Sequence, residues 1–338
     1  MTSEEVNSSK QGITVGIIGG AGYTAGELIR ILLHHPGVAN LEVQSSSHQA
    51  ESLYKAHPDL LGETEAKFKD GLSSNCALVF LCSGHGKSKD IFASGLIPTN
   101  AKVIDLSSDA RWEYGSDRHI CCEKNFIYGL PELEQDSIAS ANYVANPGCF
   151  ATAIQLGLLP LASQHRLQSE VHVSAITGST GAGAHPGATT HFSWRSNNAS
   201  VYKAFTHQHL GEINASIAHL QPEIPPIQFL PMRGAFTRGI LATMYGSFGV
   251  GIEEAREWYE QFYSQAPFVH ISEEPVSVKS VVNTNKAYIH LEEHETKLLV
   301  TVVIDNLLKG ASGQAVQNMN IMMGWDQMLG LKLKATAF

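Results

Sequence analysis

The sequence predicts an α/β protein with a Rossmann dinucleotide-binding domain and a second, α+β domain. Three observations support this prediction. The first half alternates short β-branched strands with amphipathic helices, and a glycine-rich turn follows the first strand. The second half has longer segments in which apolar and polar residues alternate. A chain of 338 residues is also long for one hydrophobic core, which favours two domains.

Composition restricts the possible partners. The chain carries 23 basic and 32 acidic residues, a net charge of −9, which argues against binding to nucleic acid or anionic membranes. No apolar run approaches the ~18 residues of a membrane span. The five cysteines have no disulfide-framework spacing, which suits a reducing cytoplasm. Residues 1–12 are polar and are expected to form a flexible tail instead of a secretory signal.

The first β-α unit carries the dinucleotide signal. Residues 13–18 form a predicted strand, and glycines follow in a GxxGxxG spacing from Gly16 to Gly22. Thr24 and Glu27 have the spacing of a capping box that would begin a helix. This combination can seat a pyrophosphate, although a tight βα turn also uses glycines without any ligand.

The next strand favours NADP over NAD. Residues 41–44 end in Ser45 and Ser46, where an acidic residue would bind the ribose 2′-hydroxyl of NAD. Hydroxyl groups tolerate a 2′-phosphate, which predicts NADP. The alternative is that each serine simply belongs to a solvent-exposed turn.

Two further strands end in glycine or polar residues. Residues 77–81 are followed by Ser83 and His85, and residues 103–106 are followed by Ser107. Open α/β sheets bind ligands outside the carboxyl ends of their strands. These side chains are therefore expected at a shared ligand site.

A candidate nucleophile follows at the start of a predicted helix. Residues 128–133 are predicted to form a compact turn, and residues 143–145 form the last strand before Pro147 and Gly148. The apolar spacing that follows places Cys149 at a helix N-terminus, where free amides favour a thiolate and can stabilise an oxyanion. A pKa below about 8.5 is expected for this thiol. A lone cysteine is otherwise more often a small buried apolar residue.

The second half is predicted to form a sheet covered by helices on one face. The first domain is expected to span residues 13–148, completed by a C-terminal helix within 313–338, and the catalytic and oligomerisation domain residues 149–312. The predicted strands are residues 171–176, 239–245, 276–279 and 298–303, and the predicted helices are residues 208–220, 252–263 and 313–329.

Further groups could complete the chemistry. Residues 177–183 form a loop of small residues whose amides suit a phosphate or carboxylate. His207 and His209 offer an imidazole, although a histidine pair is also compatible with packing or metal binding. No carboxylate or cysteine has a convincing ligand spacing, so no metal is expected. Three arginines in polar turns suit anions, or form ordinary surface ion pairs: Arg195, Arg233 and Arg238.

Several ordered motifs, covering about residues 13–338, resemble the N-acetyl-gamma-glutamyl-phosphate reductase family. Two positions depart from the family pattern. Ala25 stands where the family usually has glycine. Residues 231–240 form a longer turn than the usual Pro-Met-x-Arg-Gly-Ile turn of the family. The longer turn leaves open whether the substrate is N-acetylated or N-succinylated. The motifs are residues 16–24, 105–111, 128–133, 146–152, 177–183, 207–213 and 310–320.

The resemblance implies a fold of the glyceraldehyde-phosphate and aspartate-semialdehyde dehydrogenase type. It implies a cytoplasmic oxidoreductase of arginine biosynthesis, a homodimer or homotetramer, that uses NADPH to reduce an acyl phosphate to a semialdehyde and inorganic phosphate. Cys149 would form a thioester. His209 would be the acid–base group, with His207 as the alternative.

Together, the residues and the resemblance predict two binding sets. The cofactor residues are Gly19, Ala21, Gly22, Tyr23, Thr24, Ala25, Ser45, Ser46, Ser83, His85, Ser107, Gly181 and Asn318. The substrate residues are Arg111, Asn146, Ser179, Thr180, Gly181, Glu212, Arg233 and Arg238.

The two histidines are expected to differ in direction. On a helix that begins near His207, positions i and i+2 point about 200° apart, so only one ring should face Cys149. His209 is preferred because Glu212 and Ile213 lie on its side of the helix.

Two other functions remain open at this point. One is a related phosphorylating dehydrogenase that acts on aspartate semialdehyde or glyceraldehyde phosphate, which the motif from His207 to Ile213 disfavours. The other is a catalytically silent NADP-binding sensor or scaffold, which Cys149 and His209 disfavour.

Overall fold

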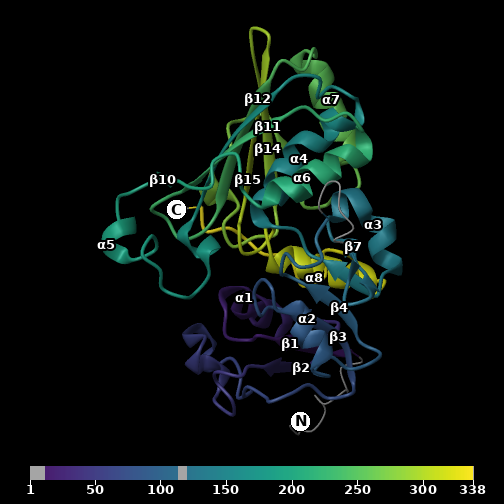
Figure 1. Ribbon diagram of the computed structural model, residues 1–338, viewed down its shortest axis with the longest axis vertical. Helices are drawn as coiled ribbons and strands as arrows, with labels where there is room; N and C mark the ends of the chain where they lie inside the picture. The colour runs from purple at the N-terminus through teal and green to yellow at the C-terminus, as the bar shows by residue number, and fades with distance from the viewer. Residues whose placement is uncertain (1–11, 113–119, 338) are drawn as a thin grey trace, which may run out of the picture.

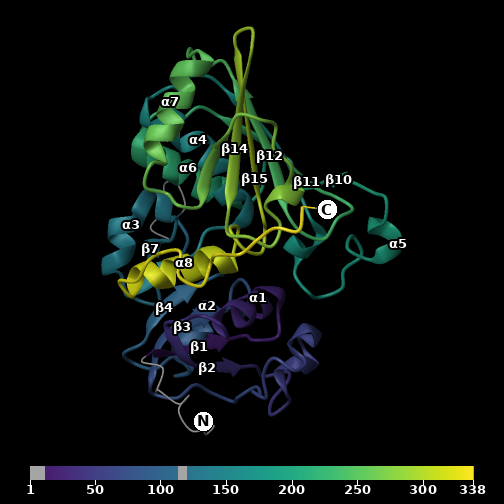
Figure 2. The same cartoon turned by 180° about the vertical axis from the view of Figure 1, so that it is seen from behind.

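The computed structural model describes residues 12–112 and 120–337, so residues 1–11 of the expected tail lie outside the described part. Two sheets lie one beyond the other along the long axis of the molecule, with the helix α8 (Ser312–Met322) between them (Figure 1). The view from behind shows the same arrangement (Figure 2). A parallel Rossmann-like sheet and a mixed sheet confirm the predicted fold class.

The first sheet contains the five strands predicted for this half and one strand that was not predicted, β7. Its six strands are all parallel, in the order β2-β1-β3-β4-β8-β7. Parallel strands need crossover connections, which the intervening helices provide. The elements are β1 (Ile13–Ile18), α1 (Tyr23–Leu32), β2 (Val38–Gln44), η1 (Leu53–Lys55), η2 (Pro58–Leu60), β3 (Cys76–Leu81), α2 (Ser88–Ala93), β4 (Lys102–Asp105), β7 (Ile127–Tyr128), α3 (Pro131–Ser140) and β8 (Tyr143–Ala145), with a separate hairpin of β5 (Ile120–Cys121) and β6 (Lys124–Asn125).

Two local predictions in this half are wrong. The capping box does not form, because Gly22 is the N-cap of α1 and Thr24 already lies inside its first turn. Glu27 points to a buried position, where it pairs with Arg238. Residues 128–133 are not a separate turn, since Pro131 begins α3, a helix position that tolerates the missing amide of proline.

The second sheet is mixed and has seven strands in the order β10-β11-β9-β12-β15-β14-β13. In β9, buried and partly exposed residues alternate, as predicted. The helices α4, α6 and α7 lie on one side of this sheet (Figures 1 and 2), with α4 packed on β12 and β15. The elements are α4 (Cys149–Ser163), β9 (Val171–Thr177), η3 (Ser179–Ala182), α5 (Phe192–Arg195), β10 (Ser200–Val201), α6 (His209–Leu220), β11 (Ile227–Arg233), β12 (Ile240–Gly246), α7 (Ile252–Phe262), β13 (Val269–Ser272), η4 (Val278–Ser280), β14 (Ala287–His294) and β15 (Lys297–Ile304).

The strand predictions for this sheet are only partly correct. Residues 276–279 form no strand, because the chain turns through η4 and the Asn283 amide then donates to the buried carboxylate of Asp305. Strands β10, β11, β13 and β14 are additional to those predicted. Pro231 masks β11 in the sequence, since proline normally disfavours an internal strand.

The closing helix α8 is shorter than predicted. It ends at Met322 instead of Leu329, because Gly324 takes a left-handed φ of 70°. The Gly324 amide then donates to the Ile321 carbonyl, and the Trp325 amide donates to the Asn320 carbonyl. These bonds terminate the helix.

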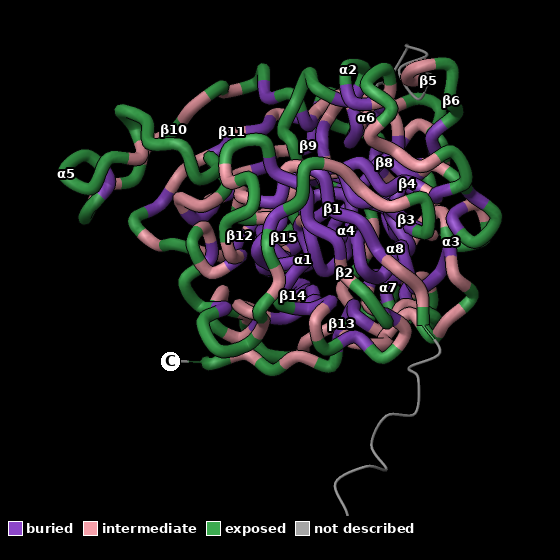
Figure 3. Tube along the Cα trace, turned by 90° about the horizontal axis from the view of Figure 1, so that it is seen from below, coloured by how far each residue is buried: buried purple, intermediate pink, exposed green. Residues whose placement is uncertain are grey.

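Helix α8 packs on the first sheet's helices. Its apolar residues Ala315 and Met319 share a buried cluster with Leu28 of α1, and α8 also contacts α3. Seen from below, the buried trace runs through the central strands and through α4 and α8 (Figure 3). Within residues 12–112 and 120–337, no helix has the length and apolar character needed to cross a membrane.

Candidate active site

A cleft with a volume of about 840 Å³ lies where segments of both sheets meet. On one side are the turn between β1 and α1 and the residues that follow β2 and β3. On the other are the loop after β9, the start of α6 and the chain after β15. The start of α4 contributes Cys149, so the cysteine and the glycine turn share one cavity.

Cys149 begins α4, as the apolar spacing predicts. Gly148 is the helix N-cap, and its carbonyl accepts the Thr152 amide. Gly310 packs directly against the cysteine: a Cβ added at Gly310 would lie 2.7 Å from the Cβ of Cys149. Only glycine at position 310 lets this backbone approach the nucleophile so closely.

The lowered pKa expected for Cys149 is wrong. Burial raises the pKa of the thiol to about 11. The Phe150 amide and Arg111 lower the pKa, and Glu212 raises it. The helix N-terminus therefore acts in the expected direction, but loss of solvent outweighs it.

Alkylation of Cys149 should consequently depend steeply on pH. With a pKa near 11, only a fraction on the order of 10⁻⁴ is thiolate at pH 7, and the thiolate is the reactive form. We expect the iodoacetamide rate at Cys149 to rise ~10-fold per pH unit between about pH 7 and 9. Mass spectrometry of timed samples measures this rate, with Cys149→Ala as the control for Cys82, which lines the same cleft. A plateau below about pH 8 would contradict the raised pKa.

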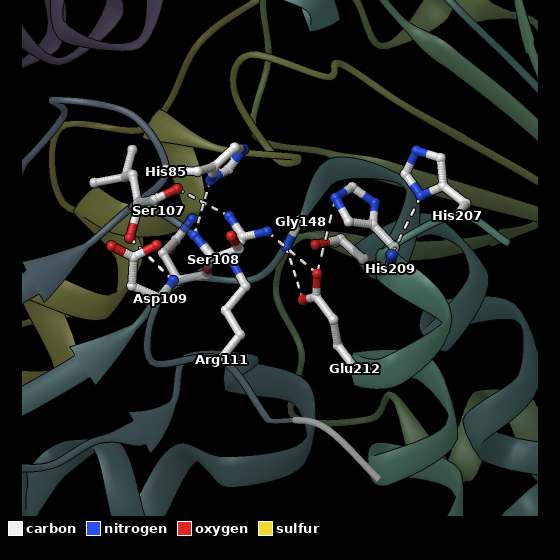
Figure 4. Close-up of polar contacts among 12 residues, drawn as sticks. His85, Ser107, Ser108, Asp109, Arg111, Gly148, His207, His209 and Glu212 are labelled. Atoms are coloured by element: carbon white, nitrogen blue, oxygen red, sulfur yellow. Dashed lines mark hydrogen bonds and ion pairs between the residues drawn. The ribbon is translucent and has the colours of Figure 1, made fainter. Parts of the chain in front are cut away.

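Glu212 is the centre of a polar network that includes Gly148, Arg111 and His209 (Figure 4). Its Oε2 accepts the Gly148 amide at 3.0 Å and the Tyr128 hydroxyl at 2.8 Å. Its Oε1 accepts Nη1 of Arg111 at 3.2 Å. Because the carboxylate bonds the amide directly before Cys149, it fixes the turn that presents the nucleophile.

The two histidines do not point apart as predicted. Helix α6 begins at His209, so His207 precedes the helix and its Nδ1 accepts the His209 amide at 3.2 Å. The two ring centroids lie 4.5 Å apart, and both residues line the cleft (Figure 4). The His209 ring packs on Gly148, where an added Cβ would lie 2.3 Å from its Nε2. That Nε2 lies 3.8 Å from Oε1 of Glu212.

Both imidazoles are neutral near pH 7. Burial, followed by Lys203 and Arg233, lowers the pKa of His207 to about 4. Burial, followed by Arg111 and His207, lowers the pKa of His209 well below its usual range. Cys149 and His209 therefore rest as a thiol and a neutral imidazole, not as an ion pair. The Nδ1 of His209 is buried with no partner among the described residues.

The glycine turn has the geometry of a pyrophosphate cradle. Gly19 has a left-handed φ of 83°, and a Cβ there would lie 2.7 Å from the Ser83 amide. At Gly22 an added Cβ would meet no protein atom within 4 Å, so this side of the turn is open. Position 19 thus requires glycine, and the turn leaves room for a ligand at the N-terminus of α1.

Most of the predicted cofactor residues line the cleft, but three do not. Ala25 is fully buried inside α1. The Ser107 hydroxyl is engaged by Ser88 and the Asp109 amide. Asn318 is buried and donates to Gly129 and Asn146, so it supports the cleft wall from behind. The predicted residues in the cleft are Gly19, Ala21, Gly22, Tyr23, Thr24, Ser45, Ser46, Ser83, His85 and Gly181.

The predicted substrate residues also include some that line the cleft and some that do not. Arg111 lines the cleft and bonds Asn146, Glu212 and Leu106. Thr180 and Asn146 line the cleft as well, but Ser179 does not, and Glu212 lies behind Gly148.

The three arginines of the second half have different environments. Arg233 lines the cleft with its guanidinium 4.7 Å from the Tyr202 ring centre, and its buried Nε has no partner among the described residues. Arg195 is buried and bonds the carbonyls of Thr189, Asn198 and Arg233. Arg238 pairs with Glu27 and Asp305 outside the cleft. The assignment of Arg238 to substrate is therefore wrong.

Some cleft residues were not predicted. Asn306 is the second residue after β15, near a strand end of the kind that binds ligands, and its side-chain amide donates to the Thr180 hydroxyl at 3.0 Å. Tyr202 and Lys203 lie in an irregular segment with no periodicity, so no sequence signal indicates them. Within residues 12–112 and 120–337, no cluster of three or more histidine, cysteine or acidic side chains has a metal-binding arrangement.

Comparison with known proteins gives consistent relatives. Residues 14–141 match the semialdehyde dehydrogenase NAD binding domain, and residues 149–306 match the semialdehyde dehydrogenase dimerisation domain. N-acetyl-gamma-glutamyl-phosphate reductases from Christiangramia forsetii and Bacteroides thetaiotaomicron are 51% and 52% identical to the chain, covering 96% of it and 100% of each relative. An aspartate semialdehyde dehydrogenase from Vibrio cholerae superposes with a TM-score of 0.70 at 15% identity, covering 93% of this chain and 99% of that one, and so shares the fold.

Proposed function

The chain belongs to the N-acetyl-gamma-glutamyl-phosphate reductase family, and we propose that it reduces N-acetyl-gamma-glutamyl phosphate with NADPH. The products are N-acetylglutamate 5-semialdehyde, phosphate and NADP⁺, a reaction of arginine biosynthesis. The single observation that carries this proposal is the position of Cys149 at a helix N-terminus, in the cleft shared by the glycine turn and His209.

Cys149 is the proposed nucleophile. Since the thiol and His209 both rest neutral, the thiol proton passes to the imidazole as Sγ attacks the acyl carbon. The C–O bond to the phosphate then breaks, and a thioester remains on Cys149. The Phe150 amide, which favours negative charge at the sulfur, is also the proposed donor to the oxyanion.

The second half-reaction uses the same residues. The turn from Gly19 to Thr24 would hold the pyrophosphate of NADPH, which when bound supplies the hydride for the thioester carbon. His209 protonates the resulting oxyanion and then accepts the hydroxyl proton as the C–S bond breaks. The semialdehyde leaves, and the His209 imidazolium returns this proton to the Cys149 thiolate, which restores the starting thiol.

The cationic groups in the cleft are proposed to bind the anionic groups of the substrate. The Nε of Arg233 has no partner in the described part of the chain, and this guanidinium is the proposed partner of the substrate carboxylate. Arg111, Thr180 and the amides near Gly181 are proposed for the phosphate, since they line the cleft around Cys149. An N-succinyl substrate is the alternative, because it carries the same acyl phosphate.

The reverse reaction tests this function. Purified protein is given N-acetylglutamate 5-semialdehyde, NADP⁺ and inorganic phosphate, and NADPH formation is followed by absorbance. N-succinylglutamate semialdehyde and aspartate semialdehyde serve as comparison substrates. We expect the highest kcat/KM with the acetylated compound. A preference for aspartate semialdehyde, or turnover that needs no phosphate, would contradict the proposal.

NADP is expected to be the preferred dinucleotide. Among the described residues, no acidic side chain lines the cleft where β2 ends, and Ser45 and Ser46 line it. If contacts to the 2′-phosphate stabilise bound NADP⁺ by about 1.5–3 kcal/mol, the kcat/KM for NADP⁺ should be ~10–100-fold higher than that for NAD⁺. Steady-state kinetics with both dinucleotides measure the ratio. The exposed Ser46 offers a matched variant, since Ser46→Glu should repel the 2′-phosphate and remove the preference.

The assembly is proposed to be a homodimer or homotetramer in the cytoplasm. Helices α4 and α7 cover one face of the seven-stranded sheet, and partly exposed side chains such as Ile176 and Leu230 lie on the opposite face. The segment around α5 extends from the body and exposes Phe192 and Trp194 (Figure 1). Light scattering after gel filtration distinguishes these states from a monomer. Residues 149–312 are the proposed catalytic and oligomerisation domain, and residues 13–148 with 313–338 the cofactor domain.

A further inference from the structure

Arg238 spans the two halves of the molecule. It lies in the turn before β12, and its Nε and Nη2 each lie 3.1 Å from Oδ2 of Asp305. Its Nη1 donates to Oε1 of Glu27 at 2.8 Å, and Glu27 belongs to α1 in the other half. The Arg238 and Glu27 side chains are 17% and 8% exposed, so water screens this ion pair little.

The turn that carries Arg238 also holds the small-residue loop of the cleft. The Ser179 amide donates to the Phe236 carbonyl at 2.8 Å, and the Gly178 amide donates to Gly239 at 2.9 Å. The Thr180 hydroxyl donates to the carbonyl of Thr237, the residue before Arg238, at 2.6 Å. Movement of Arg238 would therefore displace the loop that carries Thr180 and Gly181 into the cleft.

A second connection reinforces this one. The Gly239 amide donates to Oδ1 of Asn306 at 2.6 Å, while Nδ2 of Asn306 donates to the Thr180 hydroxyl. Gly178 also packs on this turn so closely that a Cβ there would lie 2.4 Å from the Thr237 carbonyl oxygen. The loop and the turn therefore form one rigid unit on the substrate side.

On the other side, Glu27 lies one helical turn beyond the cofactor cradle. Tyr23 and Thr24 line the cleft at the start of α1, and Glu27 follows on the same helix. The Thr24 carbonyl also accepts the Ser312 hydroxyl, which ties the helix start to α8. A ligand that fixes the start of α1 therefore also fixes Glu27, and through it Arg238.

We propose that Glu27 and Arg238 are positioning residues that couple dinucleotide binding to phosphate binding across the cleft. This inference rests on the proposed function, because it assigns the Gly19–Thr24 turn to NADP and the Thr177–Gly183 loop to phosphate. An ordered α1 holds Arg238, and Arg238 holds the loop amides in their binding geometry. Phosphate should therefore bind more tightly when NADP⁺ is present, and by reciprocity NADP⁺ should bind more tightly when phosphate is present.

Calorimetric titration of NADP⁺ with and without saturating inorganic phosphate tests the coupling. For the natural protein we expect phosphate to lower the Kd of NADP⁺ by ~5-fold or more, within the usual range of allosteric coupling. In Glu27→Gln and in Arg238→Gln this factor should fall to about 1, and the double variant should behave like either single variant. Arg238→Lys, which keeps the charge but loses the forked geometry, should retain an intermediate factor.

Arg30→Gln is the matched control. Arg30 also pairs with Glu27, but it lies on α1 itself and reaches Asp59, so its loss removes an ion pair without separating the two halves. It should keep the full coupling factor. Thermal melts identify variants that fail to fold. If a glutamine variant fails to fold, Arg238→Lys still tests the coupling.

Either of two results would overturn the coupling. One is a natural protein in which phosphate leaves the Kd of NADP⁺ unchanged, and the other is unchanged coupling in both glutamine variants. Loss of the proposed function would look different, because the natural protein would then show no phosphate-dependent oxidation of the semialdehyde. A protein that turns over normally but shows no coupling would refute only this inference.

Discussion

Replacing Cys149 with alanine is expected to lower kcat for acyl-phosphate reduction by ~10⁴-fold or more. The variant has no sulfur to form the thioester, and direct hydride transfer to the acyl phosphate would have to bypass the covalent step. The cleft and α4 should remain intact, because alanine suits the first turn of a helix. Steady-state kinetics in the direction of semialdehyde oxidation measure the loss, and calorimetry should show nearly unchanged NADP⁺ binding.

Cys82 provides the matched control for this experiment. It is the only other described cysteine that lines the cleft, and burial raises the pKa of its thiol to about 12. Cys82→Ala should keep near-normal kcat. Substantial turnover by Cys149→Ala, or its loss in Cys82→Ala, would move the nucleophile away from Cys149.

The second large effect is expected for His209→Asn, which should lower kcat and kcat/KM together by ~10²-fold or more. The His209 ring packs on Gly148, next to the nucleophile, and its Nε2 lies 3.8 Å from Glu212. Its lowered pKa leaves the ring unprotonated near neutral pH, so it can accept the thiol proton. Asparagine keeps a polar group of similar size but cannot transfer the proton. Steady-state kinetics of the folded variant measure the loss.

His207→Asn separates proton transfer from positioning. The Nδ1 of His207 already accepts the His209 amide, and its ring packs on Phe150 and Tyr202. Its replacement should mainly raise KM, with a much smaller change in kcat. If His209→Asn keeps near-normal kcat while His207→Asn loses it, the acid–base role belongs to His207. Thermal melts of both variants check that each remains folded.

The raised pKa of Cys149 bears on how both variants are interpreted. Because its pKa is raised, Cys149 is a thiol near neutral pH, so its activation has to occur as it reacts. If His209 removes the thiol proton during attack, this activation does not require a cationic or hydrogen-bonding group to bind beside Cys149. A general base at this position accounts for the expectation that losing His209 affects kcat and not only substrate binding.

Five strands and the first helix of the first half could be predicted from the sequence because the signals there are local. β-branched runs, glycine turns and apolar helix spacing depend on neighbouring residues, and β1, β3, β4 and β8 lie within a residue or two of their predicted bounds. The start of α4 at Cys149 could also be predicted from local sequence, because Pro147 and Gly148 exclude an earlier start. In the second sheet, β11 and β14 escaped prediction because their stability comes from neighbouring strands.

For the candidate site, the sequence alone determined which residue types follow the strands and where the helices α4 and α6 begin to within a residue or two. Tertiary structure decided what those residues can do. Arg233 and Arg238 stand only five positions apart, yet one lines the cleft and the other pairs with Glu27 from α1, far away in the chain. Likewise, the pKa of Cys149 depends on burial by segments such as Gly310, which approach only after folding. Desolvation and long-range ion pairs arise from packing between distant segments, and no local pattern encodes them.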